Sequence, residues 1–177
     1  TLSRAENVDE FVTRLKVFGR DNLSIPRVNP TGTHYIEDFS FFLYPFERDD
    51  DRNVIRHSYY MSDELCHAIL DYQEKVKSYE GIFKDLIAQK ESQQELLTQK
   101  QNELTTLLTE LDIIIDNLFV VQTAGEDDSN LRQQKRDKED EIVDKEYEIE
   151  QIENKIKNID QQIANVRNDL KLENNFS

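Results

Sequence analysis

The sequence predicts a mainly α fold: a long antiparallel two-helix coiled-coil hairpin, preceded by a small, irregular N-terminal segment that contains β-strands. Three observations support this prediction: two heptad ladders, one strong break between them at residues 123–129, and a different pattern in the first 60 residues. A spacing that alternates four and three residues keeps one side of an α-helix against a partner. Because the break separates the two ladders, we expect the chain to fold back on itself there.

Residues 1–60 show strand patterns rather than helical ones. In residues 11–18, β-branched and aromatic side chains recur with a period of two, and a polar turn at 19–22 leads to a short strand at 23–25. Residues 34–43 and 53–60 are expected to be extended. Aromatic residues are frequent here: Phe39, Phe41, Phe42, Tyr44, Phe46, Tyr59 and Tyr60. A core of fewer than about 60 residues is marginal, so we expect a β-rich junction at the edge of a larger domain outside this chain.

Residues 61–124 are expected to form the first long helix. Ser62 is a good N-cap, and Asp63 and Glu64 place negative charge at the positive end of the helix dipole. Only Lys90, Gln93 and Lys100 depart from the apolar pattern. The ladder consists of Leu65, Ile69, Tyr72, Val76, Tyr79, Phe83, Leu86, Lys90, Gln93, Leu97, Lys100, Leu104, Leu107, Leu111, Ile114 and Leu118.

Residues 125–128 are expected to form the hairpin loop, 129–172 the returning helix, and 173–177 the re-entry into the parent body. Gly125 suits the left-handed conformation that ends a helix, and Asp128 or Ser129 suits the next N-cap. A symmetric fold about residues 126 and 127 would place Leu104 beside Ile149. The returning ladder consists of Leu131, Lys135, Lys138, Ile142, Lys145, Ile149, Ile152, Ile156, Ile159, Ile163, Val166 and Leu170.

Charge and apolar content exclude several classes of partner. The chain has 22 basic and 37 acidic residues, a formal net charge of −15. An acidic surface repels phosphate backbones and anionic lipid heads, so we expect no nucleic acid or membrane partner, although the carboxylates are also what a solvated helix surface carries. No apolar run approaches the roughly 20 residues that span a bilayer. A single cysteine excludes an intrachain disulfide framework.

Candidate catalytic or metal-binding residues are few, and we expect no enzyme and no cofactor. Asp49, Asp51 and Asn53 have the opening spacing of a calcium loop, but Val54 stands where its glycine belongs, and a solvated turn fits as well. Cys66 and the adjacent His67 lie about 100° apart around a helix, so they do not face each other as nucleophile and base. The three histidines and Cys66 also lack the close spacing of a zinc site.

The end of the first helix carries more apolar residues than one seam needs. Ile113, Ile115, Phe119 and Val120 lie outside the ladder positions, and such a patch indicates an interaction surface, unless Leu131 and the loop cover it. The returning ladder is rich in isoleucine at both of its seam positions. In parallel coiled coils that choice favours three or four strands over two.

The N-terminal residues resemble a known family. The runs DEFVTRLKVFG at 9–19, LSI at 23–25, YIED at 35–38 and YMSDEL at 60–65 resemble the tail-tip proteins of siphophages and prophages of Gram-positive bacteria, the "prophage endopeptidase tail" group. The resemblance implies a virion component at the tail tip that assembles as a homotrimer, contacts other tail and baseplate proteins, and helps present host-binding domains. No residue here matches a catalytic motif, so the endopeptidase label does not transfer.

Two functions remain open at the level of sequence. The first is a structural segment of a phage tail-tip protein, made in the bacterial cytoplasm, whose coiled-coil arm supports assembly. The second is a cellular coiled-coil tether or adaptor with a small partner-binding head. Both predict self-association or docking rather than catalysis.

Overall fold

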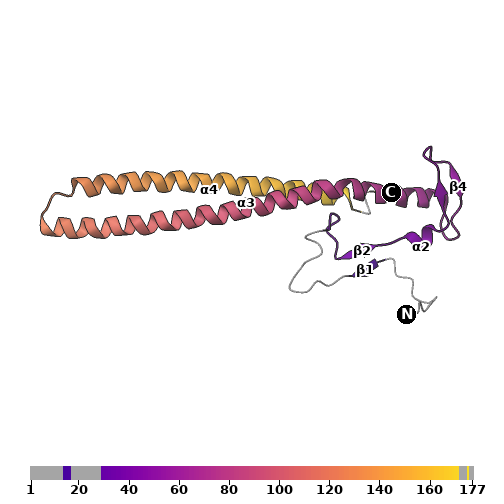
Figure 1. Ribbon diagram of the computed structural model, residues 1–177, viewed down its shortest axis with the longest axis horizontal. Coiled ribbons are helices and arrows are strands. Elements are labelled where there is room, and N and C mark those ends of the chain that lie inside the picture. Colours follow the sequence, from indigo (N-terminus) through magenta and orange to yellow (C-terminus); the bar gives the residue numbers. More distant parts are fainter. Residues whose placement is uncertain (1–13, 17–28, 172–174, 176–177) are drawn as a thin grey trace, which may run out of the picture. The chain divides into compact units, whose positions relative to one another are not determined.

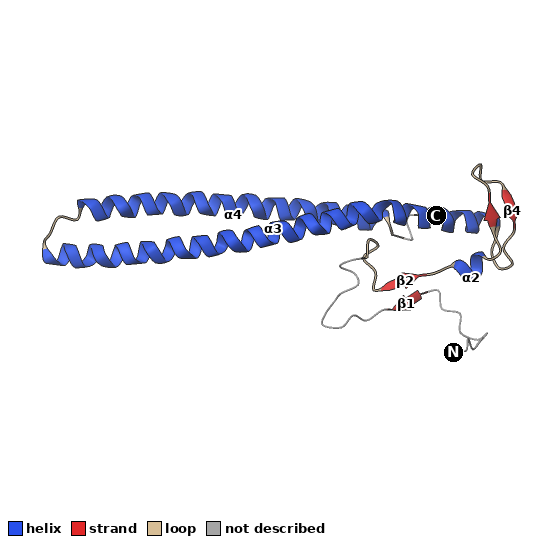
Figure 2. Ribbon diagram, viewed as in Figure 1, coloured by secondary structure: helices blue, strands red, loops and turns tan. Residues whose placement is uncertain are grey.

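A computed structural model describes residues 14–16, 29–171 and 175 of the chain. The elements are β1 (Arg14–Lys16), β2 (Tyr35–Glu37), α2 (Ser40–Leu43), β3 (Glu47–Arg48), β4 (Val54–Arg56), α3 (Asp63–Ala124) and α4 (Ser129–Asp169) (Figures 1 and 2). The predicted fold class is confirmed: two long helices pack against each other after a small strand-containing segment. The chain divides into two compact units, residues 1–85 with 163–177 and residues 86–162.

In the first unit, the strands form two separate antiparallel pairs. β1 pairs with β2, with Leu15 opposite Ile36, and β3 pairs with β4 across a register irregularity next to Arg48. β1 lies within the predicted strand at 11–18. The rest of that strand, the predicted turn at 19–22 and the predicted strand at 23–25 lie outside the described residues. The expected helix end at 172 is wrong: α4 ends at Asp169, where the Lys171 N–H donates to the Asn168 carbonyl in a tighter turn.

The prediction of an extended segment at 34–43 is wrong at its end, where α2 forms one helical turn. The Asp38 side chain accepts a hydrogen bond from the Ser40 backbone N–H (2.9 Å), and Leu43 N–H donates to the Phe39 carbonyl (2.9 Å). Aspartate favours such local turns because its carboxylate reaches the backbone N–H two residues ahead. The aromatic spacing predicts a strand, but the hydrogen bond between the Asp38 carboxylate and the Ser40 N–H stabilises a helical turn instead.

Two arginines join the β3–β4 hairpin to the beginning of α3. Arg48 donates to Asp71 (2.7 Å) and Glu74 (3.0 Å) and lies 3.3 Å from His67 Nδ1, while Arg52 donates to the second oxygen of Asp71 (2.7 Å). Partial burial raises the pKa of Asp71, but the hydrogen bonds and charges of the two arginines outweigh it, so the pKa is lowered overall. The carboxylate therefore stays charged and holds the hairpin against the helix.

The core of the first unit lies between the first turns of α3 and the last turns of α4. Tyr72 and Leu170 are buried, and the Tyr72 hydroxyl donates to the Leu170 carbonyl (3.1 Å). The Arg167 guanidinium lies 5.4 Å from the centre of the buried Phe83 ring. Gly32, at φ +71, approaches Arg167 so closely that a Cβ there would lie 2.9 Å from its side chain. The positive φ favours glycine, and a Cβ there would also have to displace the flexible Arg167 side chain.

In the second unit, α3 ends as predicted at Gly125. This residue has φ +73, its N–H donates to the Gln122 carbonyl, and the Glu126 N–H donates to the Val121 carbonyl. Together these bonds form a Schellman motif, which satisfies the last carbonyls of the helix.

The loop then runs back along the last turn of α3 before α4 begins. The Gln122 side chain donates to Asp128 (2.7 Å), and Asp127 accepts hydrogen bonds from the backbone N–H and hydroxyl of Ser129. Asp128 also accepts from Arg132, and hydrogen bonds to Ser129 and Arg132 lower the pKa of Asp127 and Asp128, respectively. Both carboxylates lie at the positive end of the α4 dipole, so they stabilise the start of the helix.

Three lysines at seam positions pair with a glutamate on the opposite helix. Their side chains are largely shielded, with exposed fractions of 17 to 23%. A shielded ammonium needs a close carboxylate, because burying an unpaired charge is costly. The three pairs are Lys138–Glu110 (2.9 Å), Lys145–Glu103 (2.8 Å) and Lys100–Glu148 (2.9 Å).

These pairs show that the symmetric register predicted from the sequence is wrong. In these pairs the residue numbers add to 248, and in the pair Lys90–Asp160 they add to 250, so Leu97 lies across from residues 151 to 153, next to Ile152 rather than Ile156. Likewise Leu104 lies across from Lys145 rather than Ile149. The reason is the loop: it folds back, and α3 runs past the first residue of α4 (Figure 1). A fold that is symmetric about the loop centre ignores this overhang.

The cluster of Lys100, Glu103, Lys145 and Glu148 predicts a specific acid sensitivity. Hydrogen bonds from Lys145 and Lys100 lower the pKa of Glu103 from 4.5 to about 2, so its contribution to stability is complete above pH 4.5 and is lost as the pH falls toward 2. Glu103→Gln should lower the urea midpoint at pH 7 and reduce the loss of stability between pH 4.5 and 2. Urea titrations followed by circular dichroism measure both effects.

The matched control is Glu95→Gln, which removes an exposed glutamate of α3 that has no ion pair within the described part of the chain. This control should change neither the midpoint at pH 7 nor the acid dependence. Equal behaviour of the two variants would contradict the role of the cluster.

Candidate interaction surface

The four residues predicted to form an interaction surface lie on the last three turns of α3, next to the loop. Their side chains are exposed, with exposed fractions of 56% for Ile113, 42% for Ile115, 72% for Phe119 and 64% for Val120. Leu118, which lies among them in the sequence, is a seam residue and is buried. We call these four residues the apolar tip.

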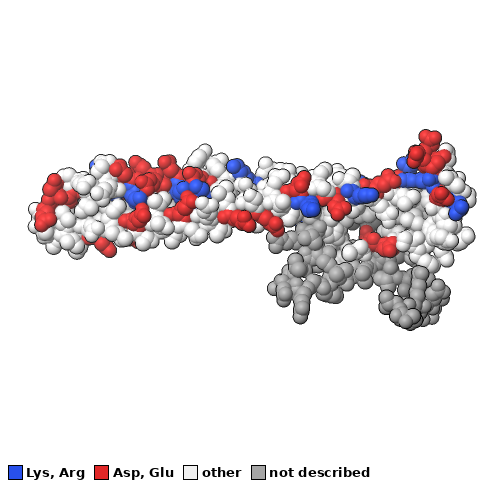
Figure 3. Space-filling model, viewed as in Figure 1, with Lys and Arg blue, Asp and Glu red and all other residues white. Residues whose placement is uncertain are grey.

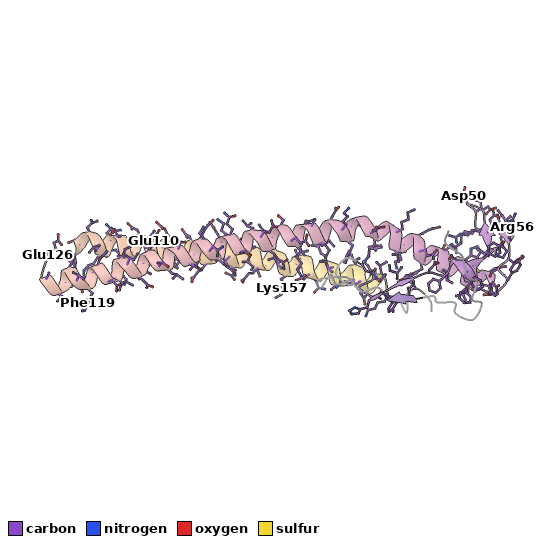
Figure 4. The ribbon with its side chains drawn as sticks, turned by 60° about the horizontal axis from the view of Figure 1, so that its bottom comes forward. Asp50, Arg56, Glu110, Phe119, Glu126 and Lys157 are labelled. Carbon is purple, nitrogen blue, oxygen red and sulfur yellow. The ribbon has the colours of Figure 1, made fainter. Side chains whose placement is uncertain are left out.

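The apolar tip lies outside the seam with α4, on the two flanks of α3. Ile115 and Phe119 are four residues apart and lie side by side on one flank of α3, and Ile113 and Val120, seven residues apart, lie on the other flank, roughly 130° around the helix. Figure 4 shows Phe119 on the side of α3 that is remote from α4. Since the seam positions already hold the hairpin together, the tip is additional to the intrachain core.

Leu131 and the loop do not cover the apolar tip. The loop side chains form hydrogen bonds among themselves and with the adjacent helix ends, and all four tip residues remain exposed. The neighbouring charges are acidic: Asp112 and Asp116 on α3, and residues 126–128 in the loop. By helical position Asp112 and Asp116 lie between the two pairs, so the tip consists of two small exposed apolar areas with acidic residues between them and at the loop.

A second exposed cluster, of aromatic rings, lies in the first unit. Phe41 stacks on Tyr60 with ring centres 5.0 Å apart, Tyr44 meets Tyr59 edge to face at 6.1 Å, and Tyr59 and Tyr60 are 6.3 Å apart. The sequence shows these aromatics, but not that they gather, because α2 and the segment after β4 bring them together. The Ser58 hydroxyl fixes this arrangement by donating to the Phe42 carbonyl (2.6 Å).

The residues considered for metal binding or nucleophilic chemistry contact other partners. His57 bonds Asp63 (2.8 Å), His67 meets the Phe46 ring edge to face at 5.2 Å, and Cys66 is fully buried. Burial raises the pKa of the Cys66 thiol, which keeps it protonated and unreactive. Asp49 accepts hydrogen bonds from the backbone and side chain of Asn53 and closes the turn between β3 and β4.

Within the described residues, no group of histidine, cysteine and carboxylate side chains has the arrangement of a metal site. Nor does any helix in that part of the chain have a stretch long and apolar enough to cross a bilayer.

The apolar tip predicts that association and folding respond differently to one double change. Burying two such side chains contributes roughly 3 to 6 kcal/mol, so Ile115→Ser with Phe119→Ser should weaken association strongly while the seam keeps the hairpin helical. Light scattering gives the mass and circular dichroism the melting temperature.

The matched control lies on α4, where Val143 and Tyr147 are exposed and also four residues apart. Val143→Ser with Tyr147→Ser should leave association unchanged. If the tip variant instead melts at a lower temperature and keeps its association state, the tip serves the intrachain core and the interface hypothesis is refuted.

The chain is similar to the SPbeta prophage-derived uncharacterized protein YomG of Bacillus subtilis (strain 168), with 48% identity over 130 residues. The match covers 73% of this chain and 15% of the relative, so the chain corresponds to a small part of the relative's length. No family model matches the chain, and no solved structure is significantly similar to it. The identity to a prophage-derived protein supports a prophage origin for this chain.

Proposed function

We propose that this chain is a structural segment of a phage tail-tip, or baseplate, protein. In this proposal the hairpin of α3 and α4 is an assembly element that self-associates as a homotrimer, contacts other tail proteins, and supports the presentation of host-binding domains. The role of the segment is mechanical rather than enzymatic. The single observation that carries the proposal is the 48% identity to a prophage-derived protein.

The form of the hairpin supports an assembly role. Its seam is complete within one chain, yet the apolar tip remains exposed next to the loop. Burying these four side chains against a partner would be favourable, because they carry no polar groups that would lose hydrogen bonds to water. The identity to a prophage-derived protein also counts against the alternative of a cellular tether.

The isoleucines of α4 do not support the homotrimer as the sequence suggested. Ile142, Ile152, Ile159 and Ile163 are buried in the structure, and the seam of the hairpin uses them. The rule that relates isoleucine at both seam positions to three or four strands holds for parallel coiled coils, whereas α3 and α4 are antiparallel. The proposal of a homotrimer therefore rests on the exposed surface of the hairpin and on the family resemblance.

The virion location predicts a direct experiment. A lysogen that carries this gene is induced, and the purified particles are labelled with gold-coupled antibodies raised against the 177-residue chain. Labelling at the distal end of the tail is the expected result, and absence of the protein from purified particles would overturn the tail-tip role. Light scattering of the purified chain should separately give three times the mass of one chain.

The two results are independent. A chain that is monomeric at every concentration but present at the tail tip would contradict only self-association through this segment.

A further inference from the structure

The two helices of the second unit differ in charge on their outward sides. Residues 129–162 on α4 contain ten acidic and seven basic residues. Residues 92–123 on α3 contain only six charged residues, and three of them, Lys100, Glu103 and Glu110, pair with α4. Figure 3 shows charged side chains crowded over α4 and a mostly uncharged surface on α3 beside the loop. The outward side of α3 therefore keeps only Glu95, Asp112 and Asp116.

The threonine hydroxyls of α3 are hydrogen-bonded within the helix. Each hydroxyl donates to the backbone carbonyl four residues earlier, so it needs no water or partner group. The threonines then offer their methyl groups to a neighbour without leaving a buried donor unsatisfied. The five bonds are Thr98–Gln94 (3.0 Å), Thr105–Gln101 (2.9 Å), Thr106–Asn102 (3.2 Å), Thr109–Thr105 (2.9 Å) and Thr123–Phe119 (2.7 Å).

A second ladder with heptad spacing runs along this outward side, parallel to the seam. Its steps alternate four and three residues, and Asp112 is its only charged member. It includes Ile115 and Phe119 of the apolar tip, and Leu108 is a further exposed apolar side chain. We call this ladder the outer stripe. It consists of Gln94, Thr98, Gln101, Thr105, Leu108, Asp112, Ile115, Phe119 and Gln122.

We infer that the outer stripe is the surface through which copies of this chain pack α3 against α3, with α4 on the outside. A stripe with heptad spacing packs best against a helix of the same spacing, and a second copy supplies a stripe of the same length and layer sequence. A nearly uncharged stripe offers little attraction to a basic or acidic partner, whereas two such stripes meet without like-charge repulsion or the desolvation of many ions. Packing through α4 would bury its dense charges.

This inference rests on the self-association proposed above and is independent of the virion location. Two added charges test it. Thr98→Glu with Thr105→Glu places carboxylates on the outer stripe at exposed positions, where glutamate is also the better helix former. Like charges would then meet across the contact, and the dissociation constant should rise by about tenfold or more, with the helical signal in circular dichroism unchanged.

The matched control is Gln151→Glu with Asn158→Glu, which adds the same two charges seven residues apart at exposed positions of α4. Light scattering of the 177-residue chain over a range of concentrations gives the mass of all three proteins. Wild type and control should associate alike, and the outer-stripe variant should dissociate to single chains at concentrations at which the other two remain associated.

Three outcomes would overturn the inference. A wild type that is a single chain at every concentration contradicts the self-association itself. Unchanged association of the outer-stripe variant shows that copies meet elsewhere. Equal weakening of the variant and the control shows a general effect of net charge, with no preference for α3.

Discussion

The pairing of three seam lysines with glutamates determines which residues of α3 and α4 lie opposite each other. The apolar members of the seam are nearly equivalent, so apolar contact alone would tolerate a slip of one whole heptad. The seam lysines do not, because a slip of one heptad changes the residues that they face. A slip in one direction brings Lys100 beside Lys155, and a slip in the other brings Lys145 beside Leu96. Each of these lysines also pairs with a glutamate three residues ahead on its own helix, but only the observed register gives Lys100, Lys138 and Lys145 a second glutamate from the opposite helix.

This pairing also shapes the outer surface of the hairpin. Glu103 and Glu110 point toward the lysines of α4, so two of the five carboxylates between residues 92 and 123 are used at the seam. What remains outward on α3 is rich in threonine, glutamine and apolar side chains, whereas α4 carries the solvated charges. One helix can then face a partner while the other faces water. An arrangement of this kind fits a segment whose function is assembly.

The sequence predicts the hairpin, its turn and its exposed tip, because each depends on local pattern. Gly125 ends α3 in the left-handed conformation, and Phe119 stays outside the seam. The register was missed because it depends on how the loop folds back, through the bond from Gln122 to Asp128. The signal was present in the lysines that break the ladders, if each is required to meet a glutamate. The helical turn α2 was missed because the aromatic spacing outweighed the turn preference of Asp38.

The outer stripe shows a different limit of the sequence. Its spacing is visible from sequence alone, but threonine and glutamine are as common on solvated helices as at contacts. The structure favours a contact surface, because the threonine hydroxyls of α3 are hydrogen-bonded to the helix backbone. Their methyl groups are then available to pack against a partner.

The register is tested most directly by disulfide formation within one chain. With Cys66 replaced by serine, cysteines at Leu97 and Ile152 should oxidise readily to an intrachain disulfide, because these positions lie across the seam from each other. Cysteines at Leu97 and Ile156 should oxidise much more slowly, since they are displaced by one helical turn. Reducing and non-reducing electrophoresis with peptide mapping identifies the bonds. Faster closure of the pair at Leu97 and Ile156, or bonds that form only between chains, would contradict a hairpin whose register the lysine–glutamate pairs determine.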